Sequence, residues 1–256
     1  MIEIPLISII TGVLTISVRL TGLMLFAPMF GSVVIPVRIK AILVVALTFL
    51  LYPSVGSSFE AHALTDWPLL IVTEFIVGVG MGIATNVVFE AVQLTGQVLG
   101  IQMGYSLVNI LDPQTQVDTP VVSMFYQSVA MLLFLQMDVH YWILRAIGKS
   151  FNYVPPGSAH INSLFTLAIL KTVGEMFGLG VQIAAPVLSV TLAADIILGL
   201  LGKAAPQMPL MLLGPAIKSL LGILILIATL RYWPDLFRRL FTDAVANGER
   251  IFHFAS

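Results

Sequence analysis

Long apolar stretches separated by short polar connections dominate this chain. Six of the stretches approach or exceed the roughly 20 residues that a helix needs to cross a bilayer: residues 5–30, 41–53, 67–91, 120–137, 163–201 and 208–233. The second is short for a span, and the fifth is long enough for two tightly joined helices. Runs such as Ala41–Leu51 are apolar on every face, whereas strands of a membrane β-barrel alternate apolar and polar residues. The pattern therefore predicts an all-α integral membrane protein.

The charges in the connections conflict with six simple spans. Connections are predicted at residues 31–40, 54–66 and 138–162. Because Lys and Arg mark cytoplasmic loops, the first connection is placed inside. Residues 93–120 would then also lie inside, although they contain no Lys or Arg. The charges agree better if the 67–91 stretch enters and leaves on one face. We therefore expect at least one apolar helix to pack in protein instead of crossing lipid.

Composition agrees with a membrane protein and excludes several other classes. Of the 256 residues, 58% are hydrophobic and 10% are charged, with a net charge of −1 and no cysteine. Soluble domains carry about 25% charged residues, and a chain this poor in charge cannot cover its surface with polar groups. Without a basic surface, no nucleic-acid binding is expected. The histidines are scattered and no catalytic triad spacing appears, so we expect no metal, no cofactor and no enzymatic activity.

Charged residues also occur inside the apolar stretches, where each costs about 2.5–3.5 kcal/mol at a helix centre on insertion scales. They are Arg19, Glu74, Glu90, Lys171, Glu175, Asp195 and Lys218. Such groups must face each other, a partner or water. Two interpretations stay open. One is structural pairing, for which Lys171 and Glu175 have suitable i, i+4 spacing; the other is a hydrated pathway or proton relay.

Two further patterns lie side by side near the middle of the chain: a glycine series and a polar segment. Gly96, Gly100 and Gly104 form a small-xxx-small series, which is typical of closely packed membrane helices. The segment 105–120 is polar, with an Asp-Pro turn signal in its centre. Irregular backbone beside membrane helices is tolerated where it is buried in protein or lines a cavity. This segment is therefore either a loop that occludes a pore or a plain connection.

The carboxyl-terminal tail has the pattern of an amphipathic helix that starts at Pro234. Its apolar stripe consists of Leu236, Phe237, Leu240, Phe241 and Val245, with Arg238, Arg239 and Asp243 on the opposite face. One interpretation is a helix in the cytoplasmic lipid interface. The other is a surface that docks another component.

These motifs resemble the FliR family of flagellar export-gate proteins, whose counterpart in virulence secretion is the SctT family. The matching residues occur in family order over nearly the whole chain: Arg19, Pro28, Gly31, Pro36–Lys40, Gly96–Gly104, Asp112, Pro113, Pro120, Leu133–Leu135, His140, Pro155, Gly157 and Gly199–Gln207. One departure is Gly214-Pro215, where FliR proteins typically have Gly-Phe-Pro. This departure affects only the expected local helix kink.

The resemblance implies an all-α fold with broken and hairpin helices. A FliP-like part (1–160) would be followed by a FliQ-like part (161–233) and the amphipathic tail (234–256). The chain would join FliP-like and FliQ-like subunits in a hetero-oligomeric helical assembly at the flagellar basal body, in the bacterial inner membrane. An FlhB-like switch protein would bind on the cytoplasmic side, and unfolded proteins would pass through the pore. Many apolar helices would pack on partner subunits as well as on lipid.

The resemblance also implies roles for particular residues. The plug of the pore would be formed by Tyr105, Ser106, Asn109, Asp112, Pro113, Gln114, Gln116 and Asp118. Met103 and Met124 flank this segment, and unbranched, adaptable methionines suit a soft gasket. The intramembrane charges would support subunit packing. The alternative function is a secondary transporter, because broken helices with intramembrane charges also describe that class. A transporter should show internal repeats, and none is visible.

Overall fold

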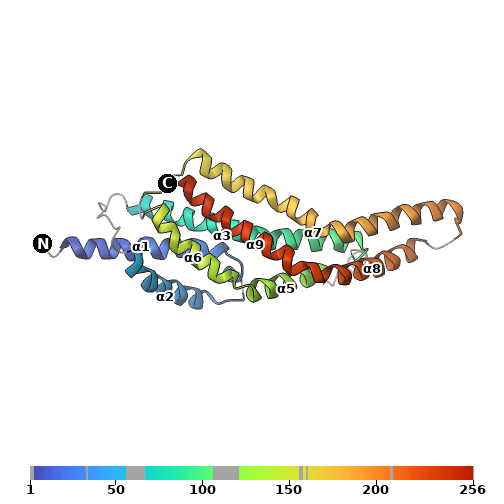
Figure 1. Cartoon of the computed structure of the whole chain (residues 1–256), viewed down its shortest axis with the longest axis horizontal. Coiled ribbons are helices and arrows are strands. Elements are labelled where there is room, and N and C mark those ends of the chain that lie inside the picture. Colours follow the sequence, from blue (N-terminus) through green and yellow to red (C-terminus); the bar gives the residue numbers. More distant parts are fainter. Residues whose placement is uncertain are drawn as a thin grey trace. The chain divides into compact units, whose positions relative to one another are not determined.

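The structure, a computed structural model, describes residues 3–32, 34–55, 67–105, 121–155, 158–159, 161–207 and 210–255, which contain helices joined by turns and no strand (Figure 1). The elements are α1 (Glu3–Phe26), α2 (Val37–Val55), α3 (Trp67–Gln102), α5 (Val121–Gln136), α6 (Val139–Tyr153), α7 (Ser163–Ala204), α8 (Leu210–Thr229), the 3₁₀ turn η3 (Leu230–Tyr232) and α9 (Trp233–Ala255). The predicted all-α class is confirmed.

Four helical stretches in the described ranges are long and apolar enough to cross a membrane. They are Ser8–Phe26, Trp67–Gln102, Ser163–Ala204 and Leu213–Phe254, and α5 with α6 would make a fifth if the two form one broken span. The predicted integral membrane protein is therefore confirmed. Each of the six predicted apolar stretches corresponds to a described helix (α1, α2, α3, α5, α7 and α8), but fewer than six are long and apolar enough to span a membrane. The last stretch continues through η3 into α9, because the backbone stays helical where the sequence turns amphipathic.

Two predicted interruptions are absent from the described helices. Residues 67–91 belong to α3, which continues without a break for 36 residues and is about 54 Å long at 1.5 Å per residue. A continuous helix cannot enter and leave on one face, so that prediction was wrong. The bilayer core is only about 30 Å thick, so α3 is longer than a single crossing of the core requires. Likewise, α7 is one 42-residue helix and not two.

The chain divides into two compact units. Unit 1 comprises Met1–Val87, Leu135–Glu175 and Leu240–Ser256, and unit 2 comprises Val88–Phe134 and Met176–Arg239. Each unit therefore combines segments that are far apart in the sequence. The long helices α3, α7 and α9 each contribute residues to both units.

In unit 1, α1 packs beside α2 and, through glycine, against α3. A Cβ atom on Gly78 of α3 would overlap the carbonyl oxygen of Arg19 in α1. The missing side chain lets the two backbones come together, as small residues do in membrane helix pairs. Of the apolar window of α3, 56% is buried inside the protein. This burial supports the expectation that an apolar helix packs in protein.

The region predicted as the connection 138–162 contains α6, which corrects the sequence analysis. Asp138 has a left-handed backbone (φ 57°) and separates α5 from α6. The buried residues of α6 recur at helical spacing: Val139, Ile143, Ala146, Ile147, Ser150 and Phe151. The polar residues between them hid this helix in a search for uniformly apolar stretches. Its apolar stripe, not its mean composition, is what folds it onto unit 1.

The predicted amphipathic helix of the tail is confirmed as α9. Phe237, Leu240 and Phe241 of its stripe are buried, while Arg238 is exposed. In unit 1, a Cβ on Gly248 would press on Met81 of α3. The apolar face of α9 is thus covered by its own chain, which contradicts the interpretation that this stripe lies in the lipid interface. Docking of another component would have to use the exposed face.

Unit 2 has an aromatic centre where α9 begins. The ring of Trp233 lies 4.7 Å from that of Tyr126 and 6.4 Å from that of Phe125, both in α5, and 5.9 Å from that of Phe237. Centroid distances of 4.5–7 Å are those at which aromatic pairs attract each other. The amphipathic tail is therefore fixed to unit 2 at its first turn.

Candidate functional site: the base of the polar loop and two buried polar clusters

The polar segment begins where α3 ends in a glycine cap. The N–H of Tyr105 donates to the carbonyl of Gly100, and the N–H of Gly104 donates to that of Ile101, both at 3.0 Å. Gly104 has φ +87°, a left-handed conformation. Together these features make the Schellman motif, which ends helices at glycine. Gly104 therefore terminates the helix, in addition to the close helix packing that the sequence analysis predicted for it.

The residues of this cap rest on α8. A Cβ on Gly104 would come within 2.7 Å of Pro215. Met103 packs against Gly222, where a Cβ would come within 2.6 Å of the methionine methyl. The hydroxyl of Ser219 donates to the hydroxyl oxygen of Tyr105 at 2.9 Å. The last residues described before the polar segment are therefore fixed in position by one helix.

A polar cluster lies immediately before this cap. Asp195 of α7 accepts a hydrogen bond from Gln102 Nε2 through Oδ2 at 2.6 Å and pairs with Lys218 Nζ through Oδ1 at 2.9 Å. The side chain of Lys218 is 17% exposed and that of Asp195 is 41% exposed. Three helices thus meet at one carboxylate. We call the following residues the loop-anchor cluster: Gln102, Met103, Gly104, Tyr105, Asp195, Pro215, Lys218, Ser219 and Gly222.

Only part of the predicted plug can be placed. Tyr105 belongs to the loop-anchor cluster, while Ser106, Asn109, Asp112, Pro113, Gln114, Gln116 and Asp118 lie outside the described residues. The two predicted gasket residues differ from each other. Met103 is 1% exposed and packs in unit 2, whereas Met124 on α5 is 52% exposed. Met103 therefore has the surroundings of an anchor, and Met124 keeps the exposure that a gasket needs.

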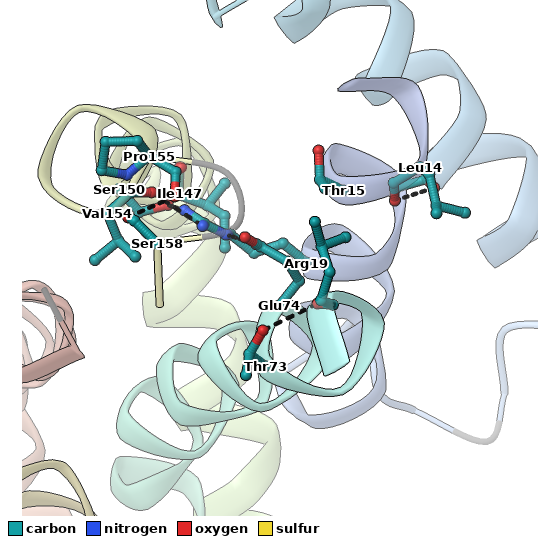
Figure 2. A network of polar contacts seen from close by, with 12 residues as sticks. Leu14, Thr15, Arg19, Thr73, Glu74, Ile147, Ser150, Val154, Pro155 and Ser158 are labelled. Carbon is teal, nitrogen blue, oxygen red and sulfur yellow. Dashed lines mark hydrogen bonds and ion pairs between the residues drawn. The ribbon is translucent and has the colours of Figure 1, made fainter. Parts of the chain in front are cut away.

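The second cluster is centred on Arg19 of α1, whose side chain is 0% exposed (Figure 2). Its Nε donates to Glu74 Oε2 of α3 at 2.6 Å. Its two terminal nitrogens donate to Ser150 Oγ at 2.9 Å and to the carbonyl of Val154 at 3.0 Å. The guanidinium carbon lies 4.1 Å from the ring centre of Phe151. One arginine therefore connects α1, α3 and the end of α6.

The physical chemistry of this arrangement is that of a satisfied buried charge. An isolated ion in an apolar interior is strongly unfavourable, so a buried charge is paired and hydrogen-bonded. Arg19 finds the carboxylate of Glu74 because Gly78, one turn further along α3, lets the two helices approach. Its cation also lies at the carboxyl end of α6, where the helix dipole favours positive charge. This result supports structural pairing for these two charges.

The remaining intramembrane charges are arranged differently. Among the described residues, Lys171 and Glu175 do not form the ion pair that their i, i+4 spacing predicted. Glu175 instead accepts a hydrogen bond from Asn247 Nδ2 of α9 at 3.2 Å. Lys171 is exposed, and Glu90 is exposed on α3. Tertiary packing therefore gives Glu175 an amide donor from α9.

Sequence reasoning missed the partners of Arg19 and Gln102. Ser150 and Val154 lay in a supposed connection, although the spacing of Ile143, Ile147 and Phe151 would have indicated a helix there. Gln102 gave no signal beyond its place at the end of an apolar stretch. Of the predicted packing glycines, Gly100 is buried.

Long apolar helices, internally paired charges and a glycine-capped helix end held by α8 define a helical membrane protein. The chain belongs to the family described as bacterial export proteins, family 1, which matches residues 10–244. The FliR resemblance seen in the motifs agrees with this family and is confirmed.

Flagellar biosynthetic proteins FliR from several bacteria are similar to this chain over most of their length. The protein of Escherichia coli K12 is 29% identical over 229 residues, which cover 88% of this chain and 86% of the relative. The protein of Bacillus subtilis 168 is 26% identical over 225 residues, with 87% of each covered. That of Aquifex aeolicus VF5 is 25% identical over 214 residues, covering 83% and 82%. The chain is therefore a subunit of the flagellar type III export apparatus, and the secondary-transporter alternative is not favoured.

Proposed function

We propose that this chain forms part of the pore through which unfolded flagellar proteins cross the bacterial inner membrane. It would do so beside FliP-like and FliQ-like subunits at the basal body, with an FlhB-like protein at the cytoplasmic side. Its own task would be structural: to complete the wall of the pore and to hold a segment that closes it. This role requires no catalysis by the chain.

The observation that carries the proposal is the loop-anchor cluster. A pore wide enough for an unfolded chain leaks ions unless a displaceable group closes it. Such a plug must move away during export and return to the same place, which requires a mobile segment on a rigid base. The glycine cap of α3 fixes the direction in which the chain leaves the helix, and α8 holds Met103 and Tyr105. These contacts support residues 106–118 as the plug.

The apolar surface supports assembly with other subunits. Exposed large apolar side chains follow α7 for most of its length: Leu164, Leu167, Leu170, Val173, Phe177, Val181, Leu192, Ile196, Ile197 and Leu200. Large contiguous apolar surfaces mark contacts with protein or membrane. A 42-residue helix is about 63 Å long, roughly twice the thickness of the bilayer core. Lipid therefore covers only part of this surface, and the remainder fits partner helices.

Deletion of residues 106–118 tests the plug. We expect cells that carry the deletion to leak small ions across the inner membrane, measured as loss of membrane potential and as sensitivity to added salt. The matched control removes residues 57–65, in the connection between α2 and α3. Both variants should be recovered with their partner subunits after gentle solubilisation. Unchanged ion conductance in the 106–118 deletion, with normal assembly, would overturn the plug assignment.

The partners are tested by the composition of the complex. Mass spectrometry of the assembly, extracted in mild detergent with a tag on this chain, should detect FliP-like and FliQ-like subunits in fixed proportion. A complex that contains only copies of this chain would contradict the proposal and favour the alternative function of a secondary transporter. This measurement is independent of the plug, because assembly and closure are scored in different experiments.

A further inference from the structure

A groove of about 250 Å³ lies in unit 1 between the first turns of α7 and the last turns of α9. From α7 it is lined by Leu164, Leu167 and Lys171, and from α9 by Arg250 and Phe254. The leucines and Phe254 are exposed to the surroundings. The groove therefore has apolar walls that continue onto the outer surface of the two helices.

The groove also contains two cations. Lys171 and Arg250 are both exposed, and neither forms an ion pair within the described part of the chain. The carboxylate of Glu175 also lines the groove, but it accepts a hydrogen bond from Asn247, which is part of the same lining. Two positive charges and one carboxylate therefore line the groove, which leaves it with a net positive charge. The groove as a whole favours an anion with apolar chains attached.

We propose that this groove binds the headgroup of an anionic phospholipid, with the phosphate between Lys171 and Arg250 and the acyl chains along Leu164, Leu167 and Phe254. Lipid covers part of the exposed apolar surface of this chain, and anionic phospholipids are amphipathic anions of the membrane. Basic pockets between membrane helices bind such headgroups. Arg provides a planar set of donors that matches phosphate, and Lys provides a point charge.

The size of the groove agrees with a headgroup and not with a whole ligand. Sites that enclose drug-sized molecules have volumes of about 300–1,000 Å³, above the volume here. A headgroup fits a groove of this size, and the acyl chains would lie on the adjoining apolar surface of Leu164, Leu167 and Phe254. A soluble phosphate compound would leave the exposed leucines uncovered. The inference rests on the membrane location of the chain and is independent of its pore function.

Native mass spectrometry of the complex, purified with the full chain, tests this site. The complex is incubated with dioleoylphosphatidylglycerol or dioleoylphosphatidylcholine, and the lipid that remains bound at rising collision energy is counted. We expect the anionic lipid to be retained and the zwitterionic lipid to be lost. The variant K171Q/R250Q should reduce retention of the anionic lipid by roughly tenfold or more, because each cation adds to the attraction for an anionic headgroup.

The matched control is K203Q/R231Q, which removes one exposed Lys and one exposed Arg outside the groove. It should retain the lipid as the unchanged protein does, and both variants should elute as intact complexes. Equal retention of the two lipids would overturn the proposal. So would unchanged retention in K171Q/R250Q, or a photocrosslinker at Leu167 that captures a partner protein in place of lipid. If deletion of residues 106–118 causes no ion leak, this lipid-binding result is unaffected.

Discussion

Arg19 and Glu74 are 55 positions apart in the sequence, yet Nε of one lies 2.6 Å from Oε2 of the other, with both side chains fully buried. This contact differs from a second ion pair among the described residues, Lys218–Asp195, which is partly exposed. The difference in burial determines how much each pair should contribute to stability.

The substitution Glu74→Ala should strongly destabilise unit 1. It leaves the guanidinium of Arg19 buried without its carboxylate, and breaking a buried pair costs about 3–5 kcal/mol. The measurement is chemical unfolding of the purified chain in detergent. The exposed Lys149→Gln on α6 is the control, with an expected change within about 0.5 kcal/mol.

The double variant R19M/E74M tests whether the loss comes from the unpaired charge. Replacing a buried pair by apolar residues of similar size is often tolerated, so the double variant should be more stable than Glu74→Ala alone. If the double variant is as unstable as Glu74→Ala, the packing and hydrogen bonds of Arg19 stabilise unit 1, and the pairing of its charge with Glu74 does not. The contacts of Arg19 with Ser150 and Val154 would then be the important ones.

The partly exposed pair should contribute little. Where water reaches the pair, a double-mutant cycle on Asp195→Asn and Lys218→Met should give a coupling energy of about 1 kcal/mol or less, because water screens exposed pairs. The same cycle on Arg19 and Glu74 serves as the comparison and should give a larger value. A strong coupling at Asp195 would mean that this carboxylate is shielded in the protein as purified.

Gly104→Ala should weaken the base of the polar loop. The left-handed conformation costs an L-residue about 1–2 kcal/mol, and the added methyl would also press on Pro215. Gly214→Ala is the matched control, because its methyl would meet only Leu198 at an ordinary 3.7 Å. The unfolding midpoint in denaturant should fall for Gly104→Ala alone. Equal midpoints would show that the cap relaxes without cost.

Gly96→Ala should separate α3 from α5. The new methyl would overlap the backbone of Ser123, and small residues are what allow such close helix contacts. Gly174→Ala is the control, because its methyl would meet nothing within 4 Å in this chain and alanine favours the helix by roughly 0.5–1 kcal/mol over glycine. The chain has no native cysteine, so disulfide formation between single cysteines placed in α3 and α5 can report their separation.

Much of the fold could be predicted because lipid-facing helices have an unambiguous pattern. Apolar runs indicated α1, α2, α3, α5, α7 and α8, and the stripe after Pro234 indicated α9. Uniformly apolar runs did not indicate α6, because its stripe of Ile143, Ile147 and Phe151 alternates with polar residues. They also placed the end of α3 too early, since Gln93 and Gln102 look like loop residues until their neighbours are known.

The sequence by itself determined that the chain is helical and apolar and that its apolar stretches contain charges that need partners. These properties depend on composition and local spacing. Only the tertiary structure decided which partners the charges have. Arg19 pairs with Glu74 because glycine lets two helices touch, and Glu175 turns to Asn247 instead of the nearby Lys171. Such choices depend on which distant segments pack together, and no local pattern contains that information.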